Sequence, residues 1–134
     1  MRPGALEREV AVLRSFSSEA APHPNIVGCR AFLPMGSRQI CAEQGEPLPE
    51  SLQQCHMLVL DPCEGGELFE HVLSHPGGLD ESAVAPLLLQ ICSALRHAHS
   101  HGVAHRDLKL ENVLLTSSFV PGEPVVVKLV DWGP

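Results

Sequence analysis

Four side chains near the carboxyl end of the sequence could act together on a phosphoryl group. Asp107 carries a carboxylate that can orient a hydroxyl and accept its proton, and Lys109 follows two residues later with a positive charge. Asn112 and Asp131 supply amide and carboxylate oxygens, the ligands that a hard cation such as Mg²⁺ prefers. The combination suits phosphoryl transfer, which depends on positioning and on neutralising charge more than on covalent chemistry by the protein.

A β-hairpin is expected to bring the two metal-ligand candidates together. Two apolar runs, residues 113–115 and 125–130, flank the turn-rich residues 116–124 and predict paired strands. The hairpin would return Asp131 to the neighbourhood of Asn112, and packing alone does not easily explain such a placement. Asp107 is expected on an irregular loop, from which it can reach a substrate that a helix face would hold too far away.

Periodicity predicts the remaining elements. The clearest helix spans residues 85–99, with Pro86 near its first turn and Gly102 just past its end. Its apolar face is expected to comprise Val84, Leu87, Leu88, Ile91, Leu95 and Ala98. A shorter amphipathic helix is expected over residues 6–16. Residues 26–33 and 56–60 predict strands, residues 35–54 a long loop, and residues 67–73 two helical turns.

The order of the polar residues matches a known pattern. His105, Arg106, Asp107 and Leu108 stand before Asn112 as H-R-D-L-x-x-x-N, and D-W-G follows the predicted hairpin. This resembles the catalytic loop of protein kinases followed by a variant of their D-F-G magnesium motif. The resemblance implies that Asp107 is the base, that Lys109 neutralises charge, and that His105 and Arg106 belong to the catalytic loop.

The same resemblance assigns the metal ligands and one substitution. Asn112 and Asp131 would hold Mg²⁺. Trp132 replaces the usual Phe, and its ring is expected to pack against Leu13 and His105 with a partner for its N–H.

Upstream motifs follow in the order that the kinase family uses. H-P-N-I-V at residues 23–27 resembles the turn and strand after the αC helix, so Glu9 would be the glutamate of that helix, with Glu7 as a weaker candidate. The nucleotide site implied by the resemblance comprises a gatekeeper, two hinge residues, a ribose ligand and an apolar floor. These are, in the same order, Leu60, Asp61 with Cys63, Glu67, and Leu114.

The expected fold is α+β, a protein-kinase-like domain that is incomplete. Residues 1–60 would form a remnant of the N-lobe with one helix and two strands, and residues 61–134 the hinge, helices, catalytic loop and hairpin. Lys109 and Lys128 are the sequence's two lysines, and neither matches the third-strand lysine that pairs with the αC glutamate in kinases. A glycine-rich phosphate loop and the segments beyond D-W-G are also missing from the pattern.

The implied activity is ATP-dependent phosphorylation of Ser or Thr hydroxyls on a protein substrate, with ATP and Mg²⁺ as cofactors. Lys109 after the aspartate is typical of serine/threonine kinases, and the G-G-E-L-F-E wording resembles the calmodulin-dependent group. The alternative is a non-catalytic kinase-like module that binds a partner or binds nucleotide weakly. In either case the apolar stripe of helix 85–99 is expected to need cover, so an isolated chain should be unstable unless a protein partner packs on that face.

Composition excludes other classes of function. The 134 residues hold 9 Lys+Arg and 16 Asp+Glu, a formal net charge of −7, which argues against a nucleic acid or anionic membrane as partner. Apolar runs are far shorter than the roughly 20 residues of a membrane span. Five cysteines without a C-x-x-C pair fit a reducing, intracellular and cytoplasmic location. His97 and His101 are four apart, as in some metal sites, but no carboxylate or cysteine completes a site, and structural or exposed histidines are favoured.

Overall fold

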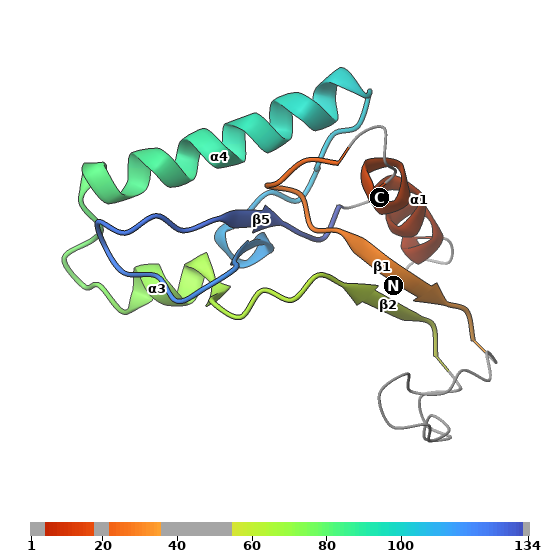
Figure 1. The fold of residues 1–134 in the computed structure, drawn as a ribbon, viewed down its shortest axis with the longest axis horizontal. Helices are drawn as coiled ribbons and strands as arrows, with labels where there is room; N and C mark the ends of the chain where they lie inside the picture. The colour runs from red at the N-terminus through yellow and green to blue at the C-terminus, as the bar shows by residue number, and fades with distance from the viewer. Residues whose placement is uncertain (1–4, 18–21, 36–54, 133–134) are drawn as a thin grey trace.

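The computed structural model describes residues 5–17, 22–35 and 55–132, arranged as two small sheets with three α-helices (Figure 1). Most of the loop expected at residues 35–54 and the glycine of the D-W-G motif lie outside these ranges. The elements in chain order are α1 (Ala5–Ser17), β1 (Cys29–Leu33), β2 (Met57–Leu60), β3 (Gly66–Glu67), α3 (Leu68–Leu73), α4 (Glu81–Ser100), the 3₁₀ turn η1 (Leu110–Asn112), β4 (Val113–Leu115) and β5 (Val127–Leu129).

Helix α1 packs beside the antiparallel pair β1 and β2 (Figure 1). Val10, Leu13 and Phe16 are buried along one face of the helix, at the spacing of three residues that an amphipathic helix produces. On the neighbouring part of α1, the Arg14 guanidinium lies 6.0 Å from the centre of the Phe32 ring. These contacts bring the helix expected at residues 6–16 against the first sheet.

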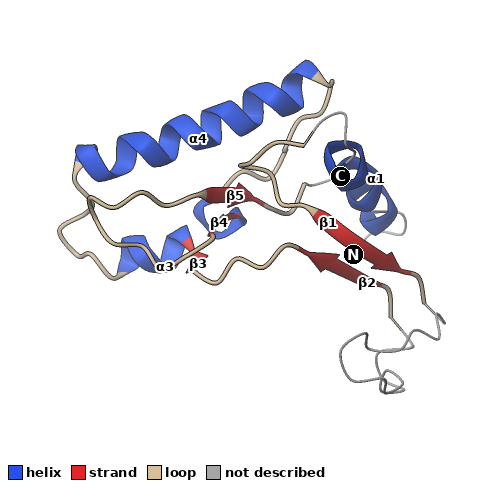
Figure 2. Cartoon of the chain, viewed as in Figure 1, coloured by secondary structure: helices blue, strands red, loops and turns tan. Residues whose placement is uncertain are grey.

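The second sheet is antiparallel with the strand order β3-β4-β5, and α4 lies along it (Figure 2). Alternation along β4 and β5 sends Val113, Leu115, Val127 and Leu129 into the core. Leu114 therefore belongs to the opposite face of the sheet. The predicted hairpin is confirmed, with Val113 opposite Leu129.

Helix α4 begins four residues before the predicted start at residue 85. The carbonyl of Asp80 accepts hydrogen bonds from the N–H groups of Ala83 and Val84, so the first turn forms at Glu81. Pro86, which was expected near the first turn, consequently lies in the second turn. The helix keeps the proline at the loss of one backbone hydrogen bond.

The end of α4 follows the prediction. Gly102 has a φ of 73°, a left-handed conformation that glycine adopts without a Cβ penalty. Its N–H donates a hydrogen bond to the carbonyl of His99 at 3.0 Å, and the N–H of Val103 donates one to the carbonyl of Ala98 at 3.0 Å. This is the Schellman arrangement, which satisfies the last carbonyls of a helix.

The buried face of α4 differs in one respect from the predicted one. Leu87, Ile91 and Ala98 are buried as expected, and Ala94 joins them. Leu88 was expected on this face but is 53% exposed. At 100° per residue, the sheet covers a stripe centred on residues 87, 91, 94 and 98, which leaves Leu88 beyond its edge.

The strand expected at residues 26–33 is divided in two. Residues 29–33 form β1, whereas Ile26 makes an isolated parallel bridge to Leu129. The N–H of Val27 bonds the carbonyl of Leu129 at 3.1 Å, and the N–H of Leu129 bonds the carbonyl of Asn25 at 2.9 Å. The segment after α1 is thus fastened to the strand that leads to Asp131. No helix within the described ranges has the length and apolarity needed to cross a membrane.

Candidate functional site

The loop between α4 and η1 brings Lys109 to Asp107. The Nζ atom of Lys109 lies 2.9 Å from Oδ2 of Asp107, and both side chains are about half exposed. The hydrogen bond from Lys109 lowers the pKa of the Asp107 carboxyl below its usual range, and the same contact raises the pKa of Lys109. Both groups are therefore charged at neutral pH, and both are accessible from solvent.

Asn112 connects the two acidic residues of the site. Its Nδ2 donates to the backbone carbonyl of Asp107 at 2.8 Å, to Asp107 Oδ2 at 3.2 Å and to Asp131 Oδ2 at 3.4 Å. The N–H of Val130 also bonds the carbonyl of Asn112 at 3.1 Å. Because Nδ2 makes these contacts, the Oδ1 atom of Asn112 remains as an acceptor beside Asp131.

Two residues of the loop and hairpin have a left-handed backbone that is uncommon outside glycine. The φ angle is 65° at Arg106 and 58° at Asp131. Such conformations persist where the surrounding structure fixes them, and they concentrate at functional sites. Arg106 also lines a cavity of about 310 Å³ with Arg8 of α1.

Trp132 anchors the end of the hairpin in the core. Its ring lies 4.7 Å from that of His105 and 5.3 Å from that of Phe16, centre to centre, and Leu13 belongs to the same buried cluster. Its Nε1–H donates to the carbonyl of Leu129 at 3.4 Å, so the partner expected for the indole exists. The large ring therefore occupies the space between α1 and the catalytic loop.

His105 is a packing residue in this arrangement, with 3% of its surface exposed. Burial lowers the pKa of its imidazole, so the ring is neutral at pH 7. The backbone of Val130 lies near enough to oppose this shift in part, yet neither ring nitrogen reaches a partner with hydrogen-bond geometry in the described ranges. His105 lies next to the polar site without contributing a charge to it.

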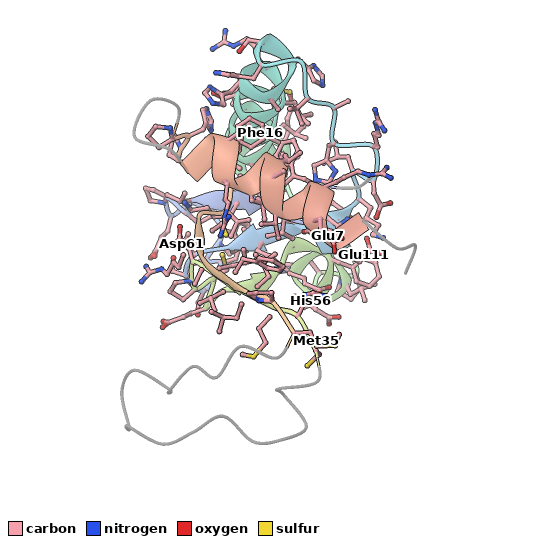
Figure 3. The ribbon with its side chains drawn as sticks, turned by 90° about the vertical axis from the view of Figure 1, so that its right-hand side faces the viewer. Glu7, Phe16, Met35, His56, Asp61 and Glu111 are labelled. Atoms are coloured by element: carbon pink, nitrogen blue, oxygen red, sulfur yellow. The ribbon has the colours of Figure 1, made fainter. Side chains whose placement is uncertain are left out.

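Glu9 points from α1 toward Asp131. It is half-buried, and burial together with the negative charge of Asp131 raises the pKa of its carboxyl. Glu7 is exposed and lies toward the opposite end of α1 from Phe16 (Figure 3). Of the two glutamates, Glu9 is the one that faces the site.

The segment after β2 leaves backbone groups open for a ligand. Leu60 is half-buried at the end of β2, opposite Cys29. The N–H of Cys63 makes no hydrogen bond within the described ranges, and the carbonyl of Asp61 receives only a thiol contact, from Cys63 Sγ at 3.8 Å. Burial raises the pKa of this thiol, which keeps it protonated.

Glu67 and Leu114 lie directly opposite each other in neighbouring strands. Lys128 is opposite Leu114 on its other side, so the three residues form a row on one face of the second sheet. This face is turned away from α4, because the alternate positions of β4 and β5 are the buried ones. Of this row, Glu67 belongs to the same stretch of chain as the open backbone groups near Cys63.

Two positioning residues, Asn25 and Gln90, were missed from the sequence. Asn25 Nδ2 donates to Gln90 Oε1 at 2.8 Å and to the carbonyl of Val127 at 3.0 Å. Gln90 Oε1 also accepts from the N–H of Val127 at 3.0 Å, and its Nε2 donates to the carbonyl of Val125 at 2.9 Å. The sequence did hold one sign of this role, because Gln90 is a polar residue beside Leu87 and Ile91 on the side of the helix that was expected to be buried.

Asp61 was expected to act through its backbone carbonyl, but its side-chain carboxylate also joins several segments of the chain. It accepts from the N–H of Gly28 at 3.1 Å and from Arg30 Nε at 2.8 Å, and it lies 4.0 Å from Lys128 Nζ. These partners are distant in sequence, so no local pattern announces them. The contacts tie the end of β2 to β1 and β5.

A comparison with protein families agrees with the motif pattern found in the sequence. The family model described as "Protein kinase domain" matches residues 2–134, and the chain belongs to this family. The mixed α and β content agrees with the expected fold class, which is that of an incomplete kinase domain.

Three curated relatives show the kind of kinase to which the chain is similar. "Calcium-dependent protein kinase 5" of Plasmodium berghei is 32% identical over 128 residues, which cover 96% of this chain and 18% of that protein. "Calcium/calmodulin-dependent protein kinase type II alpha chain" of Drosophila melanogaster is 35% identical over 130 residues, which cover 96% of this chain and 19% of that protein. The chain thus spans about a fifth of the length of these relatives. "Serine/threonine-protein kinase cds1" of Schizosaccharomyces pombe is 32% identical over 113 residues, which cover 84% of this chain and 20% of that protein, and the predicted kinship with serine/threonine kinases is confirmed.

Proposed function

We propose that the protein containing this chain transfers the terminal phosphoryl group of ATP to a Ser or Thr hydroxyl of a protein substrate. The observation that carries the proposal is the junction at Asn112, whose amide lies within 3.4 Å of the carboxylates of both Asp107 and Asp131. A proton acceptor and two oxygen ligands thereby share one solvent-accessible site.

Each residue of the junction has a separate task. Asp107 is ionised, so it can orient the attacking hydroxyl and accept its proton as the new O–P bond forms. Lys109 holds that carboxylate at 2.9 Å and places positive charge where the transferred group gathers negative charge. His105 supports the loop from beneath by its contact with Trp132, and Arg106, directly before Asp107, has the left-handed backbone of the loop.

The oxygen atoms at Asn112 and Asp131 suit Mg²⁺. Among the described residues no group of three or more His, Cys, Asp or Glu side chains is placed to hold a metal ion by itself. Mg²⁺ commonly uses one or two protein ligands together with phosphate oxygens and water. When bound, the ion would neutralise the phosphate oxygens of ATP.

The adenine and ribose would occupy the row formed by Glu67 and Leu114. The open N–H of Cys63 and carbonyl of Asp61 match the acceptor and donor on one edge of adenine. Leu114 would lie under the base, Glu67 would meet the ribose, and Leu60 would limit the depth of the pocket. In this proposal, residues 1–60 belong to the N-lobe, and residues 61–134 form the hinge and the catalytic part.

A second candidate, a kinase-like module that binds without catalysis, is favoured by the surroundings of Glu9. In kinases a lysine pairs with this glutamate and with the ATP phosphates. Here Lys109 contacts Asp107, and Lys128 lies 4.0 Å from Asp61, so neither lysine of the sequence pairs with Glu9. The charged neighbour of Glu9 is Asp131.

A transfer assay separates the two candidates. The chain and the longest natural protein that contains it would be incubated with γ-labelled ATP, Mg²⁺ and peptides that carry Ser, Thr or Tyr. The proposed kinase labels Ser and Thr peptides, and EDTA removes the labelling. ATP binding without labelling by the longest protein would establish the second candidate and refute the first.

A further inference from the structure

A cavity beside the carboxyl-terminal half of α4 is lined by basic and hydroxyl side chains. Its volume is about 330 Å³, and the residues around it are His23, Ser93, Arg96, His97 and Ser100. Two imidazoles, one guanidinium and two hydroxyls form this lining, and it includes neither a carboxylate nor an apolar side chain. In a chain with a net charge of −7, such a concentration of donors is unusual.

The helix presents four of these residues together. Positions 93, 96, 97 and 100 repeat at intervals of three and four, so they form one continuous face of α4. His23 closes the cavity from the turn after α1, and its Nε2 atom lies 3.1 Å from Ser93 Oγ. The Phe16 end of α1 also lies toward this part of α4, with 5.8 Å between the ring centres of Phe16 and His97 (Figure 3).

Among the described residues, no carboxylate lines this cavity. In the described ranges, Arg96 has no hydrogen-bond or ion-pair partner. The His23 ring lies 5.0 Å from that of His97, and the His97 ring lies 4.5 Å from that of His101. Burial lowers the pKa of His23, and the positive charges of His97, Lys128 and Arg96 lower it further. An anion in the cavity would reverse the second effect.

We propose that this cavity binds a phosphate monoester, held by the Arg96 guanidinium, the His23 and His97 imidazoles and the Ser93 hydroxyl. A guanidinium donates two parallel hydrogen bonds to phosphate oxygens, and hydroxyls and imidazoles supply the remaining donors. The site is separate from the proposed catalytic junction and does not depend on its activity. A competing explanation is that Arg96 and His97 only complement the negative end of the α4 dipole.

Binding is tested on the full chain by calorimetric titration at pH 6.5 and constant ionic strength. The probes are phenyl phosphate, a phosphoserine peptide, the same peptide with serine, and phenyl sulfate. We expect both phosphate probes to bind and the serine peptide not to bind. Tighter binding of the phosphopeptide would identify a phosphorylated side chain as the source, and equal binding a small phosphate ester.

Two pairs of variants locate the site. Arg96→Gln should weaken phosphate binding by about tenfold or more, because it removes a charge-assisted pair of hydrogen bonds, whereas Arg30→Gln should leave it unchanged. His97→Gln should weaken binding as well, and His99→Gln, an exposed histidine of the same helix, should not. Equal affinity in Arg96→Gln and the parent chain, or no binding of either phosphate probe, would overturn the proposal.

A structural reading of Arg96 predicts a different set of results. If the basic residues only complement the helix dipole, the variants lower the midpoint of urea unfolding and leave phosphate binding unchanged. The proposed site also requires that phosphate shift the imidazole NMR signals of His23 and His97 and leave those of His99 in place. Signals that do not move with phosphate would contradict it even if the variants were less stable.

Discussion

The lowered pKa of Asp107 is due mainly to one neighbour. The Lys109 ammonium 2.9 Å away stabilises the carboxylate, and Asn112 adds a weaker hydrogen bond at 3.2 Å. Both side chains are exposed, so the pair contributes little to folding stability. Its effect belongs to the chemistry of the site, where the carboxylate must stay ionised and oriented.

Replacing Lys109 should therefore raise the pKa of Asp107 toward the ordinary value. In Lys109→Met the hydrogen bond and the positive charge both disappear, and the remaining bond from Asn112 is the weaker of the two. The carboxyl signal of Asp107 in a carbon-13 NMR titration reports the change. Lys128→Met is the matched control and should leave Asp107 where it is; a parent-like titration in Lys109→Met would contradict this account.

Glu9 should make the stability of the chain depend on pH in the opposite sense from a salt-bridged acid. Its pKa is raised in the folded chain by burial and by Asp131, so ionisation favours unfolding as the pH rises through that pKa. Glu9→Gln removes the penalty and should be more stable than the parent at pH 7 and no more stable at pH 3. Urea unfolding at both values measures it.

Glu7→Gln is the control for this comparison, because Glu7 is exposed on the same helix. It should change the free energy of unfolding by less than about 0.5 kcal/mol at either pH. A Glu9→Gln variant that loses stability at pH 7 would mean that the carboxylate has a favourable partner.

At the scale of elements, α4 holds the hairpin through one side chain. The Gln90 side chain hydrogen-bonds the amide of Asn25, the N–H of Val127 and the carbonyl of Val125. It therefore links α4 both to the turn after α1 and to the segment that forms β5. The strand that ends at Asp131 is thereby fixed in register. Helix and hairpin form one unit even though they are far apart in the sequence.

Gln90→Leu should loosen this unit. The substitution keeps the volume and removes every hydrogen bond, so it should cost about 1 to 3 kcal/mol for each buried group left without a partner. Urea unfolding would measure the loss, with the exposed Cys92→Ala of the same helix as a control that stays within about 0.5 kcal/mol of the parent. Parent-like stability in Gln90→Leu would show that water or rearrangement replaces these bonds.

Elements with a strong local pattern were predictable from the sequence, and contacts between distant segments were not. The helix over residues 6–16 and the Gly102 stop depend on periodicity and backbone preference, and both are present. The split at Ile26 depends on a bridge to Leu129 and leaves no mark in its own neighbourhood. The start of α4 is a local feature that was missed, because Asp80 is a residue type typical of helix N-caps.

The candidate site shows the same division. The types and spacing of Asp107, Asn112 and Asp131 predicted that a hairpin would bring them together, and the structure has the hairpin and the short distances. The Asp61 junction with Lys128 could not be predicted, because 67 residues separate the partners and only the packed sheets bring them within 4.0 Å. Pairing across that distance is a property of the folded chain.

At the scale of the whole molecule, none of the described segments covers one side of α4. Leu88 is 53% exposed and Leu89 is 72% exposed, next to the exposed Cys92. We propose that a protein partner covers this face, because contiguous apolar side chains on a surface favour association. The same face would otherwise promote self-association of the isolated chain.

The double variant Leu88→Ser with Leu89→Ser should reduce self-association without lowering stability. Exposed leucines contribute little to the core, so the free energy of unfolding should change by less than about 0.5 kcal/mol per site. Sedimentation velocity over a range of concentrations would detect the change, with the exposed Leu73→Ser of α3 as control. A parent chain that is monomeric and melts cooperatively would refute the need for cover.

The central claim is that Asp107 acts as the base in phosphoryl transfer to a hydroxyl. The most direct measurement is the rate of ³²P transfer from ATP to a serine peptide by the longest natural protein containing the chain, compared with Asp107→Asn and with Asp80→Asn. Asp80 is exposed and makes no side-chain cap bond, so its substitution is a matched control. We predict a fall of about 10² or more for Asp107→Asn and none for Asp80→Asn; equal transfer by Asp107→Asn and the parent would contradict the account.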